Sequence, residues 1–462
     1  MFTKRLILIT LAAIATAIGS EAQLRAVTAG DMPEQWAYTS EFVQQDPVYD
    51  SWWQLFGDAQ LDSLIARGIA NNFDLKAAAS RIKIAQQQLR MARAGYFPQI
   101  GLSGGWTKQQ SSGKINETPQ VTTDYFDLGL SMNWEIDVFG KIYSQSKAKK
   151  AAVEVSRATR TAAEVSIAAN IASAYMQLRT LQAREALMLA NTETQKEVLR
   201  ITQVRYETGL SSKLDVMQAT TTYASTKAAI ADVHAAMQNT IYAMAVLLAE
   251  YPANLEAELG PFRPMPEYQK IVAVGVPAQL LRRRPDVIEA EAMLAQYAAE
   301  LGVAKKDFLP TISIQGSIGT SAHKGGDLFT DKSFTYSIAP RLSWTLFDGL
   351  SRHAGVVAAR EQMQIGIDNY NNTVLGAIQE VNTAMSSYTG AIRYIQALDE
   401  ALSAANESFT LSMDLYKQGL TSFINVQNAQ ASVLQYSDQV IEARGRALSS
   451  LIQIYRALGG GF

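Results

Sequence analysis

Residues able to carry out catalysis or to bind a metal are few in this chain and lie far apart. Its histidines, His234, His323 and His353, show no spacing typical of metal ligands, so each is interpreted as a surface or packing residue. Cysteine is absent, which excludes disulfides, thiol nucleophiles, cysteine-ligated zinc and acylation on a cysteine. The sequence predicts no enzyme activity, no cofactor and no metal site.

Charged and glycine-rich segments do not form a recognisable binding motif either. The segment GGDLF at 325–329 lacks the Lys-Ser/Thr pair of a phosphate-binding loop. Net charge is −2 and the basic residues are spread out, which argues against nucleic-acid binding. The run Arg282, Arg283 and Arg284 is interpreted as a solvated face, with ion pairs between subunits as the alternative.

The chain repeats itself, and the repeat predicts two copies of one large unit. Near Pro98 and Pro310 similar segments recur at a shift of 212 residues, and further on the shift is 210. The residues shared at a shift of 210 are Trp134, Tyr206, Gly209, Leu210, Val216 and Ala219, which return as Trp344, Tyr416, Gly419, Leu420, Val426 and Ala429.

The N-terminus has the pattern of a secretory signal peptide, with Lys4 and Arg5 before an apolar run and small residues up to Ala22. A buried N-terminal helix is the alternative. No other stretch approaches the ~20 apolar residues of a spanning helix. We predict a signal peptide at 1–22, a first repeat with an N-terminal extension and a Pro-rich connection at 23–275, and a second repeat at 276–462.

Each repeat contains a long helical hairpin. Residues 144–205 include no Gly and no Pro, so they would form a helix roughly 90 Å long. A turn at 208–211 and a return helix to about 248 follow. In the second repeat the corresponding parts are 355–417, 419–422 and a return to 457. Shorter helices are predicted within 51–94, with a break near Asn71, and within 277–306. The length of the helices in the two hairpins predicts extended coiled coils.

Two strand pairs precede the long helices. Apolar residues alternate with polar ones from Phe126 to Ile136, and weaker alternation marks 100–106, 312–318 and 334–344. Loops at 107–124 and 320–333 join the strands, and Pro340 predicts a bulge or an edge strand. Such strands could cross a bilayer at a tilt, with aromatic residues at the interfaces. The alternative is a half-buried soluble sheet.

Four strands cannot close a barrel, and lipid tolerates no open sheet edge. The membrane interpretation therefore requires oligomerisation, and three chains would supply twelve strands and twelve long helices. The predicted fold class is α+β, an outer-membrane β-barrel continued by an α-helical coiled-coil barrel, with an internal tandem repeat.

Several motifs resemble those of the TolC-like outer-membrane efflux proteins, and the OprM-like, NodT-type branch in particular. They are WWQLFGDAQLDSLI, LLRRRPDVIEAEAMLAQYAAELGVAKKDFLPTISI, SWTLFDG and the turns YETGLSSKLDVMQA and YKQGLTSFINVQNAQ. The resemblance covers the mature chain. It implies a homotrimer in outer-membrane lipid, whose helical tunnel crosses the periplasm to meet a periplasmic adaptor protein and an inner-membrane efflux pump that exports small molecules such as drugs.

The resemblance also implies roles for the turns. Acidic residues ring the periplasmic mouth in the family, whereas this chain has Asn425 and Asn428 there, with Ile424 as the constriction and Asp215 near it. The turn glycines suit left-handed helix caps, and each turn places a leucine at a polar helix end. We expect the adaptor to dock on these residues, or the leucines merely to pack on their own hairpins. They are Gly209, Leu210, Gly419 and Leu420.

A protein of another class fits some of these observations. A secreted structural or adhesive coiled-coil protein would need the signal peptide and the long helices but no pore. Extraction from outer membranes as a trimer, together with ion conduction in a planar bilayer, would distinguish a duct from this alternative.

Overall fold

The computed structural model describes residues 26–45, 51–112, 114, 120–267 and 271–460. The predicted signal peptide at 1–22 lies outside them. The chain divides into two compact units, and each contains parts of both halves of the sequence. Unit 1 is built chiefly from 81–157 and 289–371, and unit 2 from Val27–Ser80, Ala158–Ile288 and Asn372–Phe462. The repeat boundaries 23–275 and 276–462 stay a prediction.

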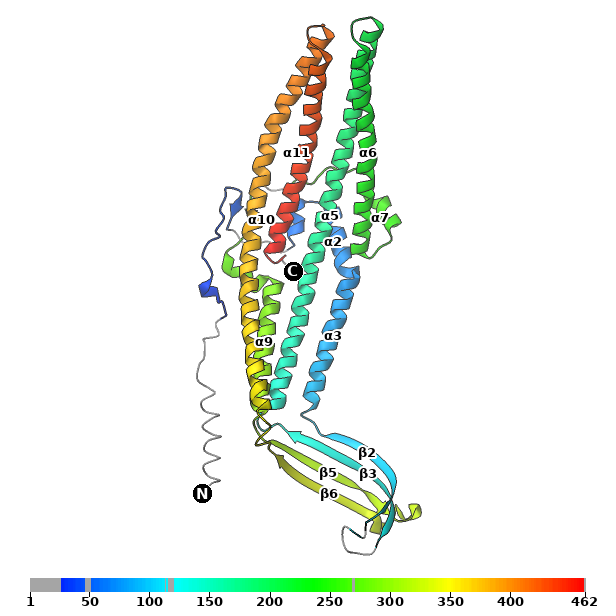
Figure 1. Ribbon diagram of the computed structural model, residues 1–462, viewed down its shortest axis with the longest axis vertical. Coiled ribbons are helices and arrows are strands. Elements are labelled where there is room, and N and C mark those ends of the chain that lie inside the picture. The colour runs from blue at the N-terminus through cyan, green and yellow to red at the C-terminus, as the bar shows by residue number, and fades with distance from the viewer. Residues whose placement is uncertain (1–25, 46–50, 113, 115–119, 268–270, 461–462) are drawn as a thin grey trace. The chain divides into compact units, whose positions relative to one another are not determined.

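Unit 1 contains a sheet of four antiparallel strands in the order β2-β3-β5-β6 (Figure 1). The predicted strand pairs are confirmed, but the predicted loops were too long. Backbone pairing continues to Gln110 opposite Thr122 and to Thr320 opposite Phe334, because ladder hydrogen bonds do not require apolar side chains. Residues 111–121 and 323–333 connect the strands of the two pairs. The strands are β2 Gln99–Gln110, β3 Thr122–Ile136, β5 Thr311–Ala322 and β6 Phe334–Ser343.

Strand β6 forms one edge of this sheet, as Pro340 predicted. Its register with β5 runs without interruption from Ser343 to Phe334, and Pro340 lies opposite Ile314. The edge alternative is therefore confirmed and the bulge is not present. Within one chain a proline is tolerated here because an edge strand is paired on one side only.

The repeat reappears in the hydrogen bonds of unit 1. Trp134 on β3 donates its indole N–H to the carbonyl oxygen of Tyr96 at 2.9 Å. Its repeat counterpart Trp344, just after β6, donates to the carbonyl oxygen of Phe308, also at 2.9 Å. Each tryptophan thus fastens a strand end to the chain just before the first strand of its own pair.

The helices follow the predicted order. Asn72 caps the break between the first two, since its side-chain oxygen accepts from the amides of Asp74 and Leu75. The long helices α5 and α10 each have 67 residues, and each α10 boundary lies 210 residues after that of α5. The helices are α2 Ala59–Asn71, α3 Phe73–Ala94, α5 Lys141–Glu207, α6 Lys213–Leu248, α7 Pro252–Leu259, α8 Leu280–Arg283, α9 Pro285–Lys306, α10 Ser351–Lys417 and α11 Phe423–Ala457.

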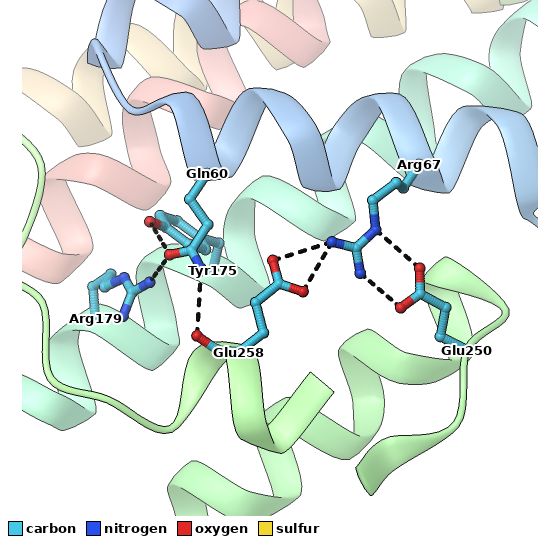
Figure 2. Close-up of polar contacts among 6 residues, drawn as sticks. All are labelled: Gln60, Arg67, Tyr175, Arg179, Glu250 and Glu258. Atoms are coloured by element: carbon cyan, nitrogen blue, oxygen red, sulfur yellow. Dashed lines mark hydrogen bonds and ion pairs between the residues drawn. The ribbon is translucent and has the colours of Figure 1, made fainter. Parts of the chain in front are cut away.

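Helix α2 is anchored in unit 2 by apolar packing and ion pairs. Leu61, Leu64 and Ile65 on one of its faces are fully buried. On another face, Arg67 pairs with Glu250 at 2.6 Å and with Glu258 at 2.9 Å (Figure 2). These carboxylates raise the pKa of Arg67. Since Glu258 belongs to α7 and Glu250 lies just before it, Arg67 holds the inter-repeat connection against α2.

A buried arginine lies nearby on α5. Arg179 is fully buried and donates to the side-chain oxygens of Gln182 and Gln60, each at 2.5 Å. Its guanidinium stacks over the ring of Tyr175, with 4.5 Å between guanidinium carbon and ring centre (Figure 2). Burial, and then the hydrogen bond that Tyr175 donates to Asp58, raise the pKa of Tyr175 to about 12. The tyrosine therefore stays a donor at neutral pH.

The Pro-rich connection is more than a linker. Besides α7 it contains β4, Val272–Ala273, which pairs in parallel with β1, Val43–Gln44, of the N-terminal extension. Trp36 donates its indole N–H to the carbonyl oxygen of Gly275 at 2.9 Å. The extension and the connection are thereby fastened together in unit 2.

No helix in the described ranges combines the length and the apolarity that a membrane span requires.

Candidate functional site

The two helical hairpins of unit 2 reverse through the same motif. Gly209 and Gly419 have φ angles of +74° and +76°, in the left-handed region that favours glycine. The amide of each glycine donates to the carbonyl three residues earlier. The amides of Leu210 and Leu420 donate five residues back, to Arg205 and Leu415. This is the Schellman motif, so both predicted glycine caps are confirmed.

The turn leucines point into solvent. Leu210 is 65% exposed and Leu420 is 70% exposed. A leucine that packed against its own hairpin would be largely covered, so this exposure argues against the packing alternative. Each turn presents one apolar side chain at its end.

Just behind the turns, both hairpins share one apolar core. This tip cluster joins buried residues of α5, α6, α10 and α11, and Phe423 packs on Tyr416 with ring centres 5.4 Å apart. It holds the hairpins against each other at their turns. Its buried members are Val198, Ala219, Met413, Tyr416, Phe423 and Val426.

Arg205 links the two turns directly, a role that sequence reasoning missed. It donates to the carbonyl oxygens of Lys417 at 2.9 Å and Leu210 at 3.4 Å, and it stacks 4.7 Å over the ring of Tyr416. The equivalent residue of the second repeat is Leu415. The difference between Arg205 and Leu415 was the only indication of this contact in the sequence. A residue of one repeat that bonds the other repeat need not be present in both.

The predicted mouth residues lie on the first two turns of α11. Ile424, Asn425 and Asn428 are exposed, while Phe423 and Val426 on the other face are buried in the tip cluster. Asn425 donates its side-chain amide to the hydroxyl of Thr421 at 2.8 Å. The structure thus groups the three predicted mouth residues on one exposed, uncharged face of α11.

Asp215 has a local partner. It lies on the first turn of α6, and its carboxylate accepts from the backbone amide and the hydroxyl of Ser212. The hydroxyl of Ser212 in turn accepts from the amide of Asp215 at 3.2 Å. In this capping box the carboxylate of Asp215 is bonded to the start of α6. The capping-box pattern could already be recognised in the sequence Ser212-Lys213-Leu214-Asp215.

Arg284 corrects the interpretation of the arginine run. It is buried rather than solvated, and its partners lie in its own chain. It donates to Asp286 at 2.6 and 3.0 Å, to Glu380 on α10 at 2.8 Å and to the carbonyl oxygen of Ala457 at 2.8 Å. Hydrogen bonds and charge from these carboxylates outweigh burial and raise its pKa. Arg282 is exposed, as a solvated face requires.

The histidines have no metal-binding surroundings. His234 faces Glu185 at 3.4 Å on the surface, and His323 contacts the carbonyl oxygen of Asp124. Across the described ranges, no three His, Cys, Asp or Glu side chains gather closely enough to hold an ion.

Comparison with known proteins identifies the architecture. Residues 64–250 and 276–460 match the family described as outer membrane efflux protein. The chain belongs to this family. Membership confirms the predicted class of fold and location in the outer membrane, and a role as an efflux channel rather than an enzyme. Family membership gives no support to the alternative function, a secreted structural or adhesive coiled-coil protein without a pore.

Individual relatives are similar in sequence to this chain over nearly its whole length. Nodulation protein T of Rhizobium leguminosarum bv. trifolii is 29% identical, over 90% of this chain and 89% of its own. The probable efflux pump outer membrane protein TtgC of Pseudomonas putida is 28% identical, over 95% and 90%.

Solved structures share the fold. The outer-membrane channel OprN superposes with a TM-score of 0.88 at 29% identity, covering 93% of this chain and 97% of its own. The outer membrane protein VceC of Vibrio cholerae gives 0.82 at 26% identity, covering 90% and 100%. These relatives support the predicted OprM-like, NodT-type branch.

Proposed function

We propose that three copies of this chain form a continuous duct through the outer membrane and the periplasm. Such a duct receives small molecules from an inner-membrane pump through a periplasmic adaptor. The observation that carries the proposal is the open sheet of unit 1, which within the described ranges has four strands and two unpaired edges, β2 and β6. Lipid tolerates no such edges, and three copies would close them into twelve strands.

The surface of the sheet also supports this assembly. Ile100, Leu102, Tyr336 and Ile338 are each at least two-thirds exposed, more apolar surface than a soluble sheet leaves uncovered. Aromatic residues sit at the loop end, where Trp106 pairs with Phe126 across β2 and β3. Others sit at the helix end, at Trp134 and Trp344. Two aromatic levels are typical of strands that cross a bilayer.

The decisive experiment measures assembly and conduction together. Extraction with a mild detergent should recover the protein from outer membranes as a trimer. The trimer should conduct ions in a planar bilayer. A monomeric species that never conducts would contradict the proposal.

Topology gives a first prediction. The loop 111–121 should be extracellular and the helical turns periplasmic. Because the native chain has no cysteine, Ser112→Cys and Lys213→Cys introduce single thiols at two exposed positions. In intact cells, a thiol reagent that cannot cross the outer membrane should label Ser112→Cys only. Both should react after the membrane is broken, and labelling of Lys213→Cys alone in intact cells would reverse the orientation.

The turn leucines give a second prediction. Changing Leu210 and Leu420 together to serine should reduce efflux and crosslinking to the adaptor, since two exposed apolar contacts are lost. At about 1–2 kcal/mol per leucine, the two substitutions together should lower adaptor affinity roughly thirtyfold or more.

The matched control is Leu189→Ser, an exposed leucine on α5 far from the turn, which should leave crosslinking intact. Trimer amounts must be equal in all three proteins. Undiminished crosslinking by the double variant would show that the adaptor binds elsewhere.

A further inference from the structure

Helix α5 begins just after the sheet of unit 1 with two exposed faces on opposite sides of the helix. One face carries Tyr143, Lys147 and Lys150, which are four and three residues apart. The other carries Gln145 and Lys149. The buried residues that separate the two faces are Ile142 and Ser146 on one flank and Ser144 and Ala148 on the other. In the wall of a tube, such a helix directs one exposed face outward and the other toward the lumen.

Exposed apolar side chains indicate which face points outward. Between strand β3 and helix α5, Val138 is 58% exposed and Phe139 is 39% exposed, and Tyr143 on the first turn of α5 is 62% exposed. Such groups at the end of a membrane strand are stable where acyl chains meet headgroups, but not in a water-filled lumen. The opposite face begins with the polar side chains of Gln145 and Lys149. The face with Tyr143 therefore continues the lipid-facing side of the strands.

Lys147 and Lys150 are exposed cations that the fold itself does not use. Glu154, the next residue on the same face, is already paired with Arg157 at 3.1 Å. Within the described ranges neither lysine forms an ion pair or a side-chain hydrogen bond. Two positive charges on one face thus remain available to an anionic partner.

Both lysines lie close to the level of the lipid headgroups. They follow Lys141, the first residue of α5, by about 9 and 14 Å along the helix axis. The headgroup layer occupies roughly 5–8 Å beyond the hydrocarbon core. Helical side chains lean toward the N-terminus of their helix, which here is the membrane end. Long lysine side chains can therefore bring their ammonium groups back to the headgroups.

We propose that Tyr143, Lys147 and Lys150, here called the lysine face, bind anionic phospholipids of the periplasmic leaflet of the outer membrane. The ammonium groups neutralise headgroup phosphates. Tyr143 and the apolar residues before it contact the adjoining part of the acyl chains. In the proposed trimer, each copy adds its own lysine face to a basic belt beneath the barrel. The inference rests on the proposed duct and assigns it a preference among lipids.

Lipid titration of the purified full-length trimer tests this preference. The trimer in a non-ionic detergent is given phosphatidylglycerol or phosphatidylcholine with identical acyl chains, and native mass spectrometry counts the bound lipids. The native protein should bind phosphatidylglycerol more tightly. Lys147→Gln combined with Lys150→Gln should weaken that binding roughly tenfold or more, because each lysine near a lipid surface contributes about a factor of five. Phosphatidylcholine binding should not change.

Lys149→Gln is the matched control, because it removes the same charge from the opposite face of the same helix. It should leave the preference for phosphatidylglycerol intact. Added salt should weaken the preference of the native protein, since ions screen exposed charges. A double variant that keeps the native preference, or loss of the preference in Lys149→Gln, would show that the lysine face does not bind lipid.

Ion selectivity distinguishes a lipid-facing from a lumenal position of the two lysines. In a planar bilayer with a salt gradient, the double variant should keep the reversal potential of the native pore. A shifted reversal potential would place the lysines in the lumen and overturn the inference. A native trimer that conducts but binds both lipids equally would overturn the lipid site alone. A native protein that stays monomeric and never conducts would overturn the duct as well.

Discussion

Replacing Asn428 by aspartate should create a pore that divalent cations block. Asn428 and Ile424 lie four residues apart on the exposed face of α11, and threefold symmetry would bring three copies of each together. Three carboxylates in a narrow ring would bind a hard cation, whereas three amides carry no charge. Half-block is expected at roughly 0.1–1 mM calcium, the range of weak carboxylate sites. Single-channel recording with added calcium or magnesium measures it.

Two further variants show whether the effect of Asn428→Asp is specific to the predicted mouth. Asn406→Asp adds the same charge at an exposed position of α10, away from the turn, and should not introduce block. Ile424→Ala should raise the conductance of the resting pore, because the apolar constriction that excludes water is removed. If Asn428→Asp and Ile424→Ala both conduct and respond to cations as the native protein does, these residues do not form the mouth.

Loss of Arg284 should weaken the folded chain more than most single substitutions. Arg284→Ala removes two hydrogen bonds to Asp286 at the start of α9, one to Glu380 on α10 and one to the carbonyl oxygen of Ala457 at the end of α11. Asp286 and Glu380 are about half exposed and can be rehydrated, but the Ala457 carbonyl lies in a buried contact. A cost of about 2–3 kcal/mol is expected, mainly from the orphaned carbonyl and the cavity.

Thermal unfolding in detergent, followed by circular dichroism, checks this value. The neighbouring Arg282→Ala is the matched control, because Arg282 is exposed and its loss should change stability by less than about 0.5 kcal/mol. Arg284→Lys should recover part of the loss, because its stem refills the cavity and its ammonium can donate to the Ala457 carbonyl, although it cannot reproduce the two-pronged contact with Asp286. Equal melting temperatures for the two alanine variants would contradict the role assigned to Arg284.

The sequence predicted the parts of this fold that are determined locally. An uninterrupted run without Gly or Pro specifies α5, and glycines followed by leucines specify both Schellman turns. The strands ended later than expected, because backbone pairing extends beyond the apolar alternation on which the prediction relied. Asp215 bonds Ser212 in a capping box, a local contact that the sequence pattern already contained, and its place near the mouth stays a prediction.

The contacts that sequence reasoning missed join distant segments. Arg284 looks solvated within a run of three arginines, and only the meeting of α9, α10 and the end of α11 buries it. Arg205 connects a helix of the first repeat to the turn of the second. The periodic patterns that predict helices and strands carry no information on contacts between distant segments. The contacts of Arg284 and Arg205 could be predicted only from positions at which the two repeats have different residues.

The equal length of α5 and α10 limits how this protein can change in size. Four residues inserted into one leg of a hairpin, and four into its return, would displace that turn by about 6 Å along the axis. The Arg205 bond to Lys417 and the apolar cluster behind the turns would then be out of register. Insertions and deletions should therefore be tolerated only when they occur in both hairpins at matching heights. A relative with a longer or shorter tunnel would carry paired length changes.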